Sequence, residues 1–182
     1  MFKKVLFIFC CLLFSFNAEA KKGVNIFAYS RPAPETAFYN RYGQRTVISD
    51  FKGEFVLLNF WSRHCVPCIK ELDDLNSFAL KTKDSGIRVL IISKDDEWAS
   101  AREQKELLEK YRAPDLDFYV DNDGKLSGDF GIFASPHTVL INKAGEEFGR
   151  ISGSVDWDDE DIIEEIYQLK VKYGEGQPRN DQ

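Results

Sequence analysis

The sequence predicts an α/β domain with a central mixed β-sheet flanked by helices and an N-terminal β extension. An apolar run at residues 55–61 has the composition of a strand covered on both faces. Apolar residues then recur at helical steps of three and four, as at Ile69, Leu72 and Leu75. A second apolar strand follows at residues 87–93, so we expect a β-α-β unit with a right-handed crossover.

The N-terminal residues 1–20 indicate a secretory signal peptide. Lys3 and Lys4 precede an apolar core at residues 5–16, which is too short to span a bilayer comfortably, and an Ala-x-Ala cleavage site ends at Ala20. We therefore expect an exported chain with no stable membrane insertion after cleavage. An uncleaved anchor is one alternative. Lipidation at Cys10 is another, although Phe9 stands where a lipoprotein signal needs a small residue.

Composition narrows the class of protein further. The 182 residues suit one domain, and the net charge of −6 argues against nucleic acid and anionic membrane surfaces as partners. Cys10 and Cys11 leave with the signal, so the mature chain keeps only Cys65 and Cys68. In a non-reducing compartment such a pair is suited to exchanging disulfides rather than to holding the fold together.

The stretch after the signal predicts the β extension. Residues 24–29 alternate as an edge strand does, and the prolines of residues 31–34 are expected to end it. Gly43 and Gln44 predict a turn before a short strand at residues 45–48. A second turn leads into the apolar central strand.

Cys65 and Cys68 stand where this strand meets the helix. Residues at i and i+3 of a helical turn share a face, and their Cα atoms should be about 5–6 Å apart, within disulfide range. The free N–H groups and dipole of a helix N-terminus stabilise a Cys65 thiolate, the nucleophile in disulfide exchange. Cys68 is then the resolving thiol, and Pro67 in the first turn helps the helix begin. With the strand–helix alternation downstream, this is typical of a thioredoxin-like redox motif.

Two other interpretations of the C-x-x-C motif are weaker. A zinc site would need further ligands, and His64 adjoins Cys65 too closely in sequence to chelate one ion with it. A structural disulfide that closes so short a loop would remove little chain entropy. We therefore expect no metal, and no cofactor other than a redox-active Cys65–Cys68 disulfide.

The helix of the cysteines is expected to end near Lys83. Acidic residues 95–97 then cap a second helix, which Pro114 stops. Residues 117–120 predict a strand. The following turn at residues 121–124 begins like a calcium loop but lacks the closing glutamate.

The C-terminal part predicts a hairpin and a last helix. Pro136 stands at the entry of an apolar strand within residues 133–142, and residues 148–152 form the second strand. The last helix ends at Gly174. We expect residues 175–182 to be a disordered tail.

Together these features resemble a known family. Residues 59–72, the Ser135-Pro136 strand entry and the hairpin after it resemble the TlpA/ResA-like branch of exported thioredoxin-fold proteins. The resemblance covers about residues 45–170 and implies one thioredoxin-like domain over residues 21–174. The strand–C-x-x-C–helix element is specific for the superfamily. The assignment to the TlpA/ResA-like branch rests on less specific features, namely Asn59, Glu71, the signal peptide and the N-terminal extension.

The resemblance implies a cis peptide bond between Ser135 and Pro136. In this fold it places the residue before the proline beside the cysteines, where its backbone pairs with an incoming peptide. The alternative is an ordinary trans proline at a strand edge. Trp61 and Val66 are the other substrate contacts expected around the cysteines.

The resemblance also suggests a proton acceptor. Thioredoxin has a buried aspartate six residues before the first cysteine, and here that position is Asn59, which takes no proton. Relatives in this branch use a glutamate three residues after the second cysteine, here Glu71. A partly buried Glu71 with a raised pKa would hold the proton that Cys68 gives up. The alternative is a solvated glutamate near Lys70.

Two histidines depart from the family pattern. His64 stands where relatives usually carry tryptophan; as a cation it would stabilise the Cys65 thiolate, and as a solvated loop residue it would not. His137 follows Pro136, where relatives mostly carry threonine. A copper-handling binding protein that uses Cys65, Cys68 and a histidine is therefore the alternative function. A peroxidase is disfavoured because its Pro-x-x-x-Thr/Ser-x-x-Cys pattern is absent.

We expect an exported thiol–disulfide oxidoreductase of the bacterial periplasm. It would reduce or exchange disulfides of protein partners through Cys65 and Cys68, and act as a monomer. Apocytochrome c cysteines before haem attachment are one substrate class that the resemblance implies. An exported compartment lacks the cytosolic thiol supply, so a membrane-bound electron donor is expected.

Overall fold

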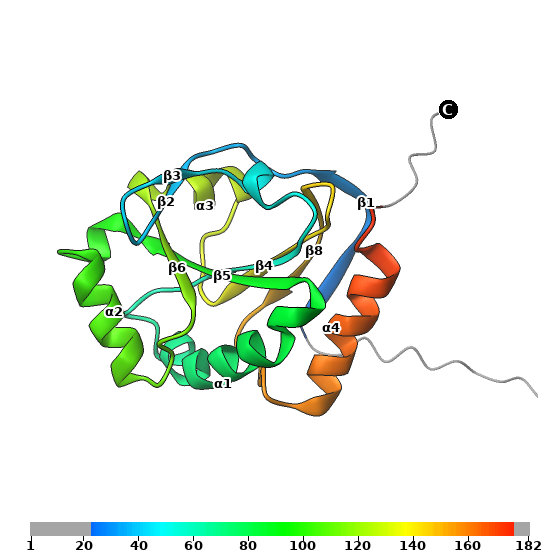
Figure 1. Cartoon of the computed structure of the whole chain (residues 1–182). Helices are drawn as coiled ribbons and strands as arrows, with labels where there is room; N and C mark the ends of the chain where they lie inside the picture. The colour runs from blue at the N-terminus through cyan, green and yellow to red at the C-terminus, as the bar shows by residue number, and fades with distance from the viewer. Residues whose placement is uncertain (1–22, 177–182) are drawn as a thin grey trace, which may run out of the picture.

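The computed structural model describes residues 23–176. Within this range an eight-stranded sheet has the order β1-β8-β7-β4-β5-β6-β2-β3 (Figure 1). The strands are β1 (Val24–Pro32), β2 (Phe38–Asn40), β3 (Arg45–Thr46), β4 (Phe55–Phe60), β5 (Ile87–Lys94), β6 (Asp117–Asp121), β7 (His137–Ile141) and β8 (Glu146–Ser152). The α-helices are α1 (Val66–Thr82), α2 (Ala101–Lys110), α3 (Lys125–Phe130) and α4 (Glu160–Tyr173).

The two ends of the chain lie largely outside this description. The predicted signal peptide, residues 1–20, is outside the described residues, and so is the predicted tail except for Glu175 and Gly176. Glu175 pairs with Lys143, in the turn between β7 and β8. None of the helices in the described range combines the length and apolar character needed to cross a bilayer.

The centre of the sheet is β4, in which all six side chains are buried. It pairs parallel with β5 and antiparallel with β7, so the predicted mixed sheet and β-α-β unit are confirmed. Alternate residues of these strands face two separate cores. One core packs under α1, α2 and α4, and the other lies between the sheet, α3 and the N-terminal segment.

The N-terminal segment reaches both edges of the sheet. β1 pairs with β8 at one edge, and β2 with β3 forms the other edge next to β6 (Figure 1). The expectation that residues 31–34 end the first strand is confirmed, because β1 ends at Pro32; it runs three residues beyond the predicted range 24–29 and has an irregularity between Ile26 and Arg31. An edge strand tolerates proline because one side of it has no ladder partner.

Four other elements differ from the prediction. The short strand expected at residues 45–48 ends at Thr46, and a 3₁₀ turn follows at Ile48–Phe51. Helix α2 begins at Ala101, because Ser100 caps it by accepting a hydrogen bond from the Glu103 N–H. The pattern did not predict β2 or α3.

Candidate active site

The two cysteines form a disulfide at the start of α1. Their sulfurs are 2.08 Å apart and their Cα atoms 5.2 Å apart, in the predicted range. Cys65 is the N-cap, and its sulfur accepts a hydrogen bond from the Cys68 N–H at 3.2 Å. Cys65 is partly exposed, whereas Cys68 is 1% exposed. An incoming thiol therefore reaches Cys65 and not Cys68, which suits Cys65 as nucleophile and Cys68 as resolving thiol.

Three residues that flank the cysteines differ in exposure. Val66 and Pro67 occupy the first two helical positions and are exposed, Val66 by 65%. Trp61 is only 3% exposed and packs against Trp98, with ring centroids 5.6 Å apart. Of these predicted substrate contacts, Val66 offers the larger free surface.

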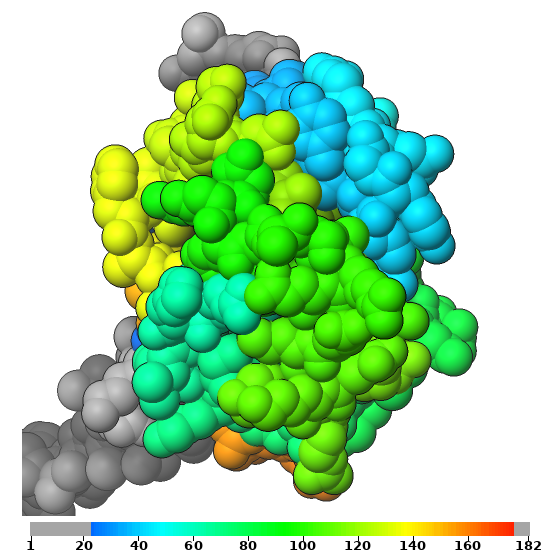
Figure 2. All heavy atoms as spheres, turned by 90° about the vertical axis from the view of Figure 1, so that its left-hand side faces the viewer, coloured from blue at the N-terminus to red at the C-terminus, as the bar shows by residue number. Residues whose placement is uncertain are grey.

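The loop before β7 lies directly beside Cys65. The Ser135–Pro136 peptide bond is cis, and the Ser135 carbonyl oxygen is 3.4 Å from the Cys65 sulfur. Between this loop and the cysteine loop a cleft of about 440 Å³ opens at the carboxyl ends of β4, β5 and β6. Figure 2 shows the turquoise segment of the cysteines and the yellow segment before β7 on the same side of the molecule.

Glu71 lies inside the protein, on the face of α1 that carries Cys68. It is 3% exposed. Asn59 Nδ2 donates to its Oε1 at 3.3 Å, and Ser154 Oγ and the Val155 N–H donate to its Oε2, each at 3.0 Å. Burial raises the pKa of Glu71, and these hydrogen bonds partly oppose the rise. A buried carboxylate whose pKa is raised accepts a proton more readily than an ordinary glutamate does.

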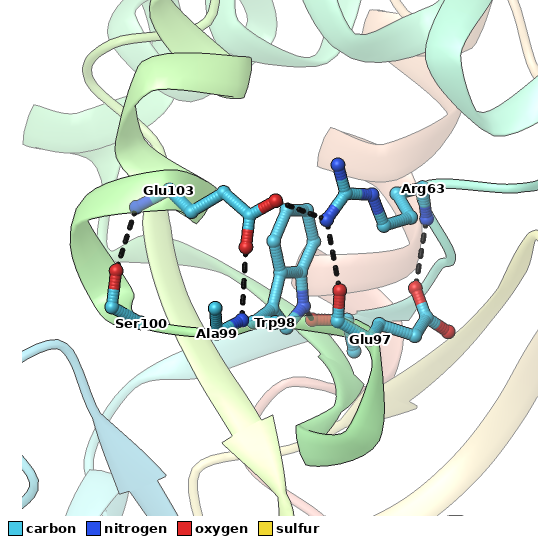
Figure 3. A network of polar contacts seen from close by, with 7 residues as sticks. Arg63, Glu97, Trp98, Ala99, Ser100 and Glu103 are labelled. Atoms are coloured by element: carbon cyan, nitrogen blue, oxygen red, sulfur yellow. Dashed lines mark hydrogen bonds and ion pairs between the residues drawn. The ribbon is translucent and has the colours of Figure 1, made fainter.

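A polar network fixes the loop that leads to Cys65 (Figure 3). The Arg63 N–H donates to Glu97 Oε2 at 2.9 Å, and its guanidinium donates to the Glu97 carbonyl at 2.9 Å and to Glu103 Oε1 at 2.7 Å. The guanidinium carbon also lies 4.8 Å from the centre of the Trp98 ring. One side chain thus joins the cysteine loop to the start of α2.

The two histidines lie in different settings. His64 is exposed and lines the cleft, whereas His137 is half-buried. Desolvation, helped by the charge of Arg150, lowers the pKa of His137, and Glu147 opposes this. Within residues 23–176, no three histidine, cysteine or acidic side chains are grouped so as to hold a metal ion. The copper alternative therefore gains no support from the geometry.

Several site residues escaped the sequence reasoning. The cleft is lined by Glu97 and Phe133, and Arg63 supports it through its hydrogen bond to Glu97. Of these three residues, only Arg63 could have been noticed in the sequence, as a charged residue two positions before Cys65. Ser154 and Val155 reach Glu71 from the loop after β8. Nothing in the local sequence links that loop to α1, because only the folded sheet brings them together.

Comparison with known proteins agrees with this geometry. The model of the AhpC/TSA family matches residues 29–146. The thiol-disulfide oxidoreductase ResA of Bacillus thuringiensis subsp. konkukian is 30% identical over 125 residues, which cover 68% of this chain and 69% of that protein. ResA of Bacillus subtilis is 23% identical over 171 residues, 94% of this chain and 91% of that protein.

Solved structures show the same fold. A thiol:disulfide interchange protein DsbE from Chlorobium tepidum superposes with a TM-score of 0.65 at 24% identity, over 77% of this chain and 96% of that one. The exposed lipoprotein thioredoxin Etrx1 of Streptococcus pneumoniae superposes with a TM-score of 0.60 at 24% identity, over 74% and 98% of the two chains. The thioredoxin-like fold predicted from the C-x-x-C element is confirmed.

Proposed function

Because the chain belongs to the AhpC/TSA family and to its ResA-like thiol–disulfide oxidoreductases, we propose that it is an exported reductant of protein disulfides. One observation carries the proposal. An oxidised pair at a helix N-terminus presents Cys65 to a cleft and keeps Cys68 buried behind it. Such a pair accepts one partner at a time and resolves without external thiol.

The reaction proceeds in two exchanges, starting from the reduced dithiol. The Cys65 thiolate attacks one sulfur of a partner's disulfide, forming a Cys65–partner bond and releasing the partner's other sulfur as a thiolate that takes a proton. The Cys68 thiolate then attacks the Cys65 sulfur and displaces the second partner thiolate. The partner gains two electrons and two protons, and the chain becomes the disulfide.

Glu71 receives the proton of Cys68 in the second exchange. Its burial and raised pKa support this role, as does its place three residues after Cys68 on one face of α1. Ser135 and Val66 lie beside the sulfur that meets the partner, and His64 and Pro67 tune the Cys65 thiolate. Asn59 orients the Glu71 carboxyl and donates no proton of its own to the reaction.

We also propose a cellular setting, on the ground of the predicted signal peptide at residues 1–20. The chain acts as a monomer outside the cytoplasm, in the periplasm of a bacterium, and uses no cofactor besides its own disulfide. A membrane-bound dithiol protein returns it to the reduced form, since that compartment holds no cytosolic thiol supply. Oxidised cysteine pairs of apocytochrome c are a substrate class that suits such a reductant.

The reduction potential of the Cys65–Cys68 couple tests the proposed direction. Equilibrating the chain with dithiothreitol or glutathione buffers should give a value near or below about −250 mV, close to thioredoxin. A value near about −120 mV would identify an oxidant and overturn the direction. In an insulin reduction assay, Cys65→Ser should abolish turnover, and Cys68→Ser should trap mixed disulfides.

A further inference from the structure

The hydrogen-bond donors around the Glu71 carboxyl group differ in whether they can pass on a proton. Asn59 Nδ2 and the Val155 N–H are amide groups, which donate a hydrogen bond and keep their proton. The indole of Trp157, which also lowers the pKa of Glu71, is a donor only. The hydroxyl of Ser154 donates to Glu71 Oε2 at 3.0 Å, and its oxygen can also accept. Of these groups, only the Ser154 hydroxyl can take up one proton and release another.

Exposure points to the same side chain. Asn59 is 2% exposed, and its Nδ2 also donates to the buried Thr138 hydroxyl at 3.1 Å, so a path in that direction leads into the sheet. Ser154 is exposed, although Glu71, to which it donates, is 3% exposed. The Ser154 hydroxyl thus joins the buried carboxyl group to the surface of the protein.

Ser154 lines a hollow of about 260 Å³. The hollow is bordered by β1, the loop after β8 and α4, with Val24 and Ile162 among its lining residues. Its volume is enough for several water molecules, each of which takes about 30 Å³ in the liquid. Among the described residues, none lines both this hollow and the cleft beside Cys65. A partner segment bound in the cleft need not cover the hollow.

The hollow has an acidic wall. Asp156 and Asp159 line it, and both are exposed. The negative charge also reaches Asp74, whose pKa is raised by desolvation and by nearby carboxylates, Asp156 foremost among them. A negative surface raises the local concentration of cations, protons included. Water in this hollow is therefore well placed to exchange protons with the bulk solvent.

We propose that the Ser154 hydroxyl carries the proton between Glu71 and the water of this hollow. After Cys68 has given its proton to the carboxylate, the Glu71 O–H donates to Ser154 Oγ. The Ser154 oxygen takes this proton and releases its own to a water molecule, which leaves Glu71 ionised again. The same steps in reverse supply the proton that Cys68 needs when the disulfide is reduced. This inference rests on the proposed function and adds a second opening to its site, through which protons pass.

Ser154→Thr and Ser154→Val test this proton path, because threonine and valine have the same shape and only threonine has a hydroxyl. Carbon-13 NMR of the Glu71 carboxyl group follows its titration in the oxidised chain, and the signal is identified by its loss in Glu71→Gln. At the midpoint of the titration, the line shape gives the rate at which this group exchanges its proton with solvent. We expect this rate to be about 10²-fold lower in Ser154→Val than in Ser154→Thr, as for the loss of a proton-transfer group.

Wild type and Ser154→Thr should show one averaged signal that moves with pH, and Ser154→Val a broadened or divided one. Ser49→Val is the matched control and should leave the exchange rate unchanged, because Ser49 Oγ donates at 2.6 Å to another carboxylate, that of Glu35. Equal exchange rates in Ser154→Thr and Ser154→Val would overturn the inference, even if their midpoints differed, since a shifted midpoint shows only a lost hydrogen bond. Failure of the wild-type chain to reduce insulin would instead refute the proposed function, whatever the exchange rates.

Discussion

The Glu71 carboxyl group is buried and accepts hydrogen bonds from two other segments of the chain. Asn59 comes from β4, and Ser154 and Val155 come from the loop after β8. These donors hold the carboxyl in one orientation. The cost of burying its charge raises its pKa, so a side chain that is usually ionised becomes available to carry a proton.

Replacing Glu71 by glutamine removes the titrating group and keeps the shape of the side chain. We expect Glu71→Gln to slow the attack of Cys68 on a preformed Cys65–peptide disulfide by about 10²-fold, the usual effect of losing a proton acceptor. Single-turnover release of the peptide thiol measures this rate. Glu106→Gln, on the exposed face of α2, is the control. An unchanged rate would exclude Glu71 from proton transfer.

Glu71→Gln should also change how the free energy of unfolding depends on pH. The raised pKa means that the folded chain keeps this proton at pH values where the unfolded chain has lost it. Stability therefore falls as pH rises from the unfolded pKa, about 4.3, through the raised folded pKa. The free energy of unfolding of the wild-type chain minus that of Glu71→Gln should decrease over this window. A pH-independent difference in urea unfolding would contradict the assigned pKa direction.

The cysteines could be located from sequence because their spacing belongs to one helix, and Glu71 because the resemblance assigns a glutamate to that position and the spacing agrees. Positions 65, 68 and 71 share a face whatever the rest of the chain does. The surroundings of that face were not predictable, since Ser154 and Phe133 arrive from distant loops. The periodicity of a sequence predicts which residues share one face of a helix or strand. It does not predict which distant segments pack against that face.

The segment between β5 and α2 depends on Arg63 for its contact with the cysteine loop (Figure 3). Trp98 contributes by packing on Trp61 and by donating from its indole nitrogen to Ser93 at 2.7 Å. These contacts join two loops that lead into different helices. The position of the residues just before Cys65 is thereby tied to α2.

Arg63→Ala should lower the free energy of unfolding by about 1 kcal/mol. The ion pair with Glu103 is partly exposed and contributes little, but the hydrogen bond to the Glu97 carbonyl is also lost. Hydrogen exchange at residues 97–103 should become faster. Arg102→Ala, which removes an exposed pair with Glu106, is the control and should change stability by less than about 0.5 kcal/mol. Equal effects of the two variants would argue against a network.

The elements that sequence patterns missed are those held by tertiary contacts. Helix α3 has six residues and contains Gly128, so it lacks a readable period. The Asp121 carboxylate starts it by accepting the N–H groups of Leu126 and Ser127 at 2.8 and 2.9 Å. Strand β2 has three residues and exists through its pairing with β6 and β3. Strong local patterns, as in β4 and α1, needed no such support.

The N-terminal segment supplies the strands at both edges of the sheet, β1 at one edge and β3 at the other. At the β1 edge the strands approach closely. A Cβ atom at Gly149 would lie 2.7 Å from Ile26 Cδ1 and 2.9 Å from the Asn25 oxygen. Glycine at this position of β8 is what allows β1 to pack against the sheet.

Gly149→Ala should therefore destabilise the chain by about 1–3 kcal/mol, the usual cost of overpacking, and loosen β1. Urea unfolding measures the first effect and limited proteolysis of β1 the second. Gly128→Ala is the matched control, because a Cβ there meets nothing within 4 Å and lies in a helix. It should raise stability by about 0.5–1 kcal/mol. A Gly149→Ala chain as stable as wild type would show that β1 is not held closely.

The pairing of β1 with β8 also sets the order in which the molecule can be completed. Among the strands of residues 23–176, β1 is the first to leave the ribosome, and β8 is the last. Until β8 has emerged, β1 has no partner, and the sheet lacks one edge. During that wait Pro32 and the irregularity after Ile26 limit pairing between β1 strands of neighbouring nascent chains. The edge strand β1 thus has features that disfavour pairing with another chain while the remainder of the protein is synthesised.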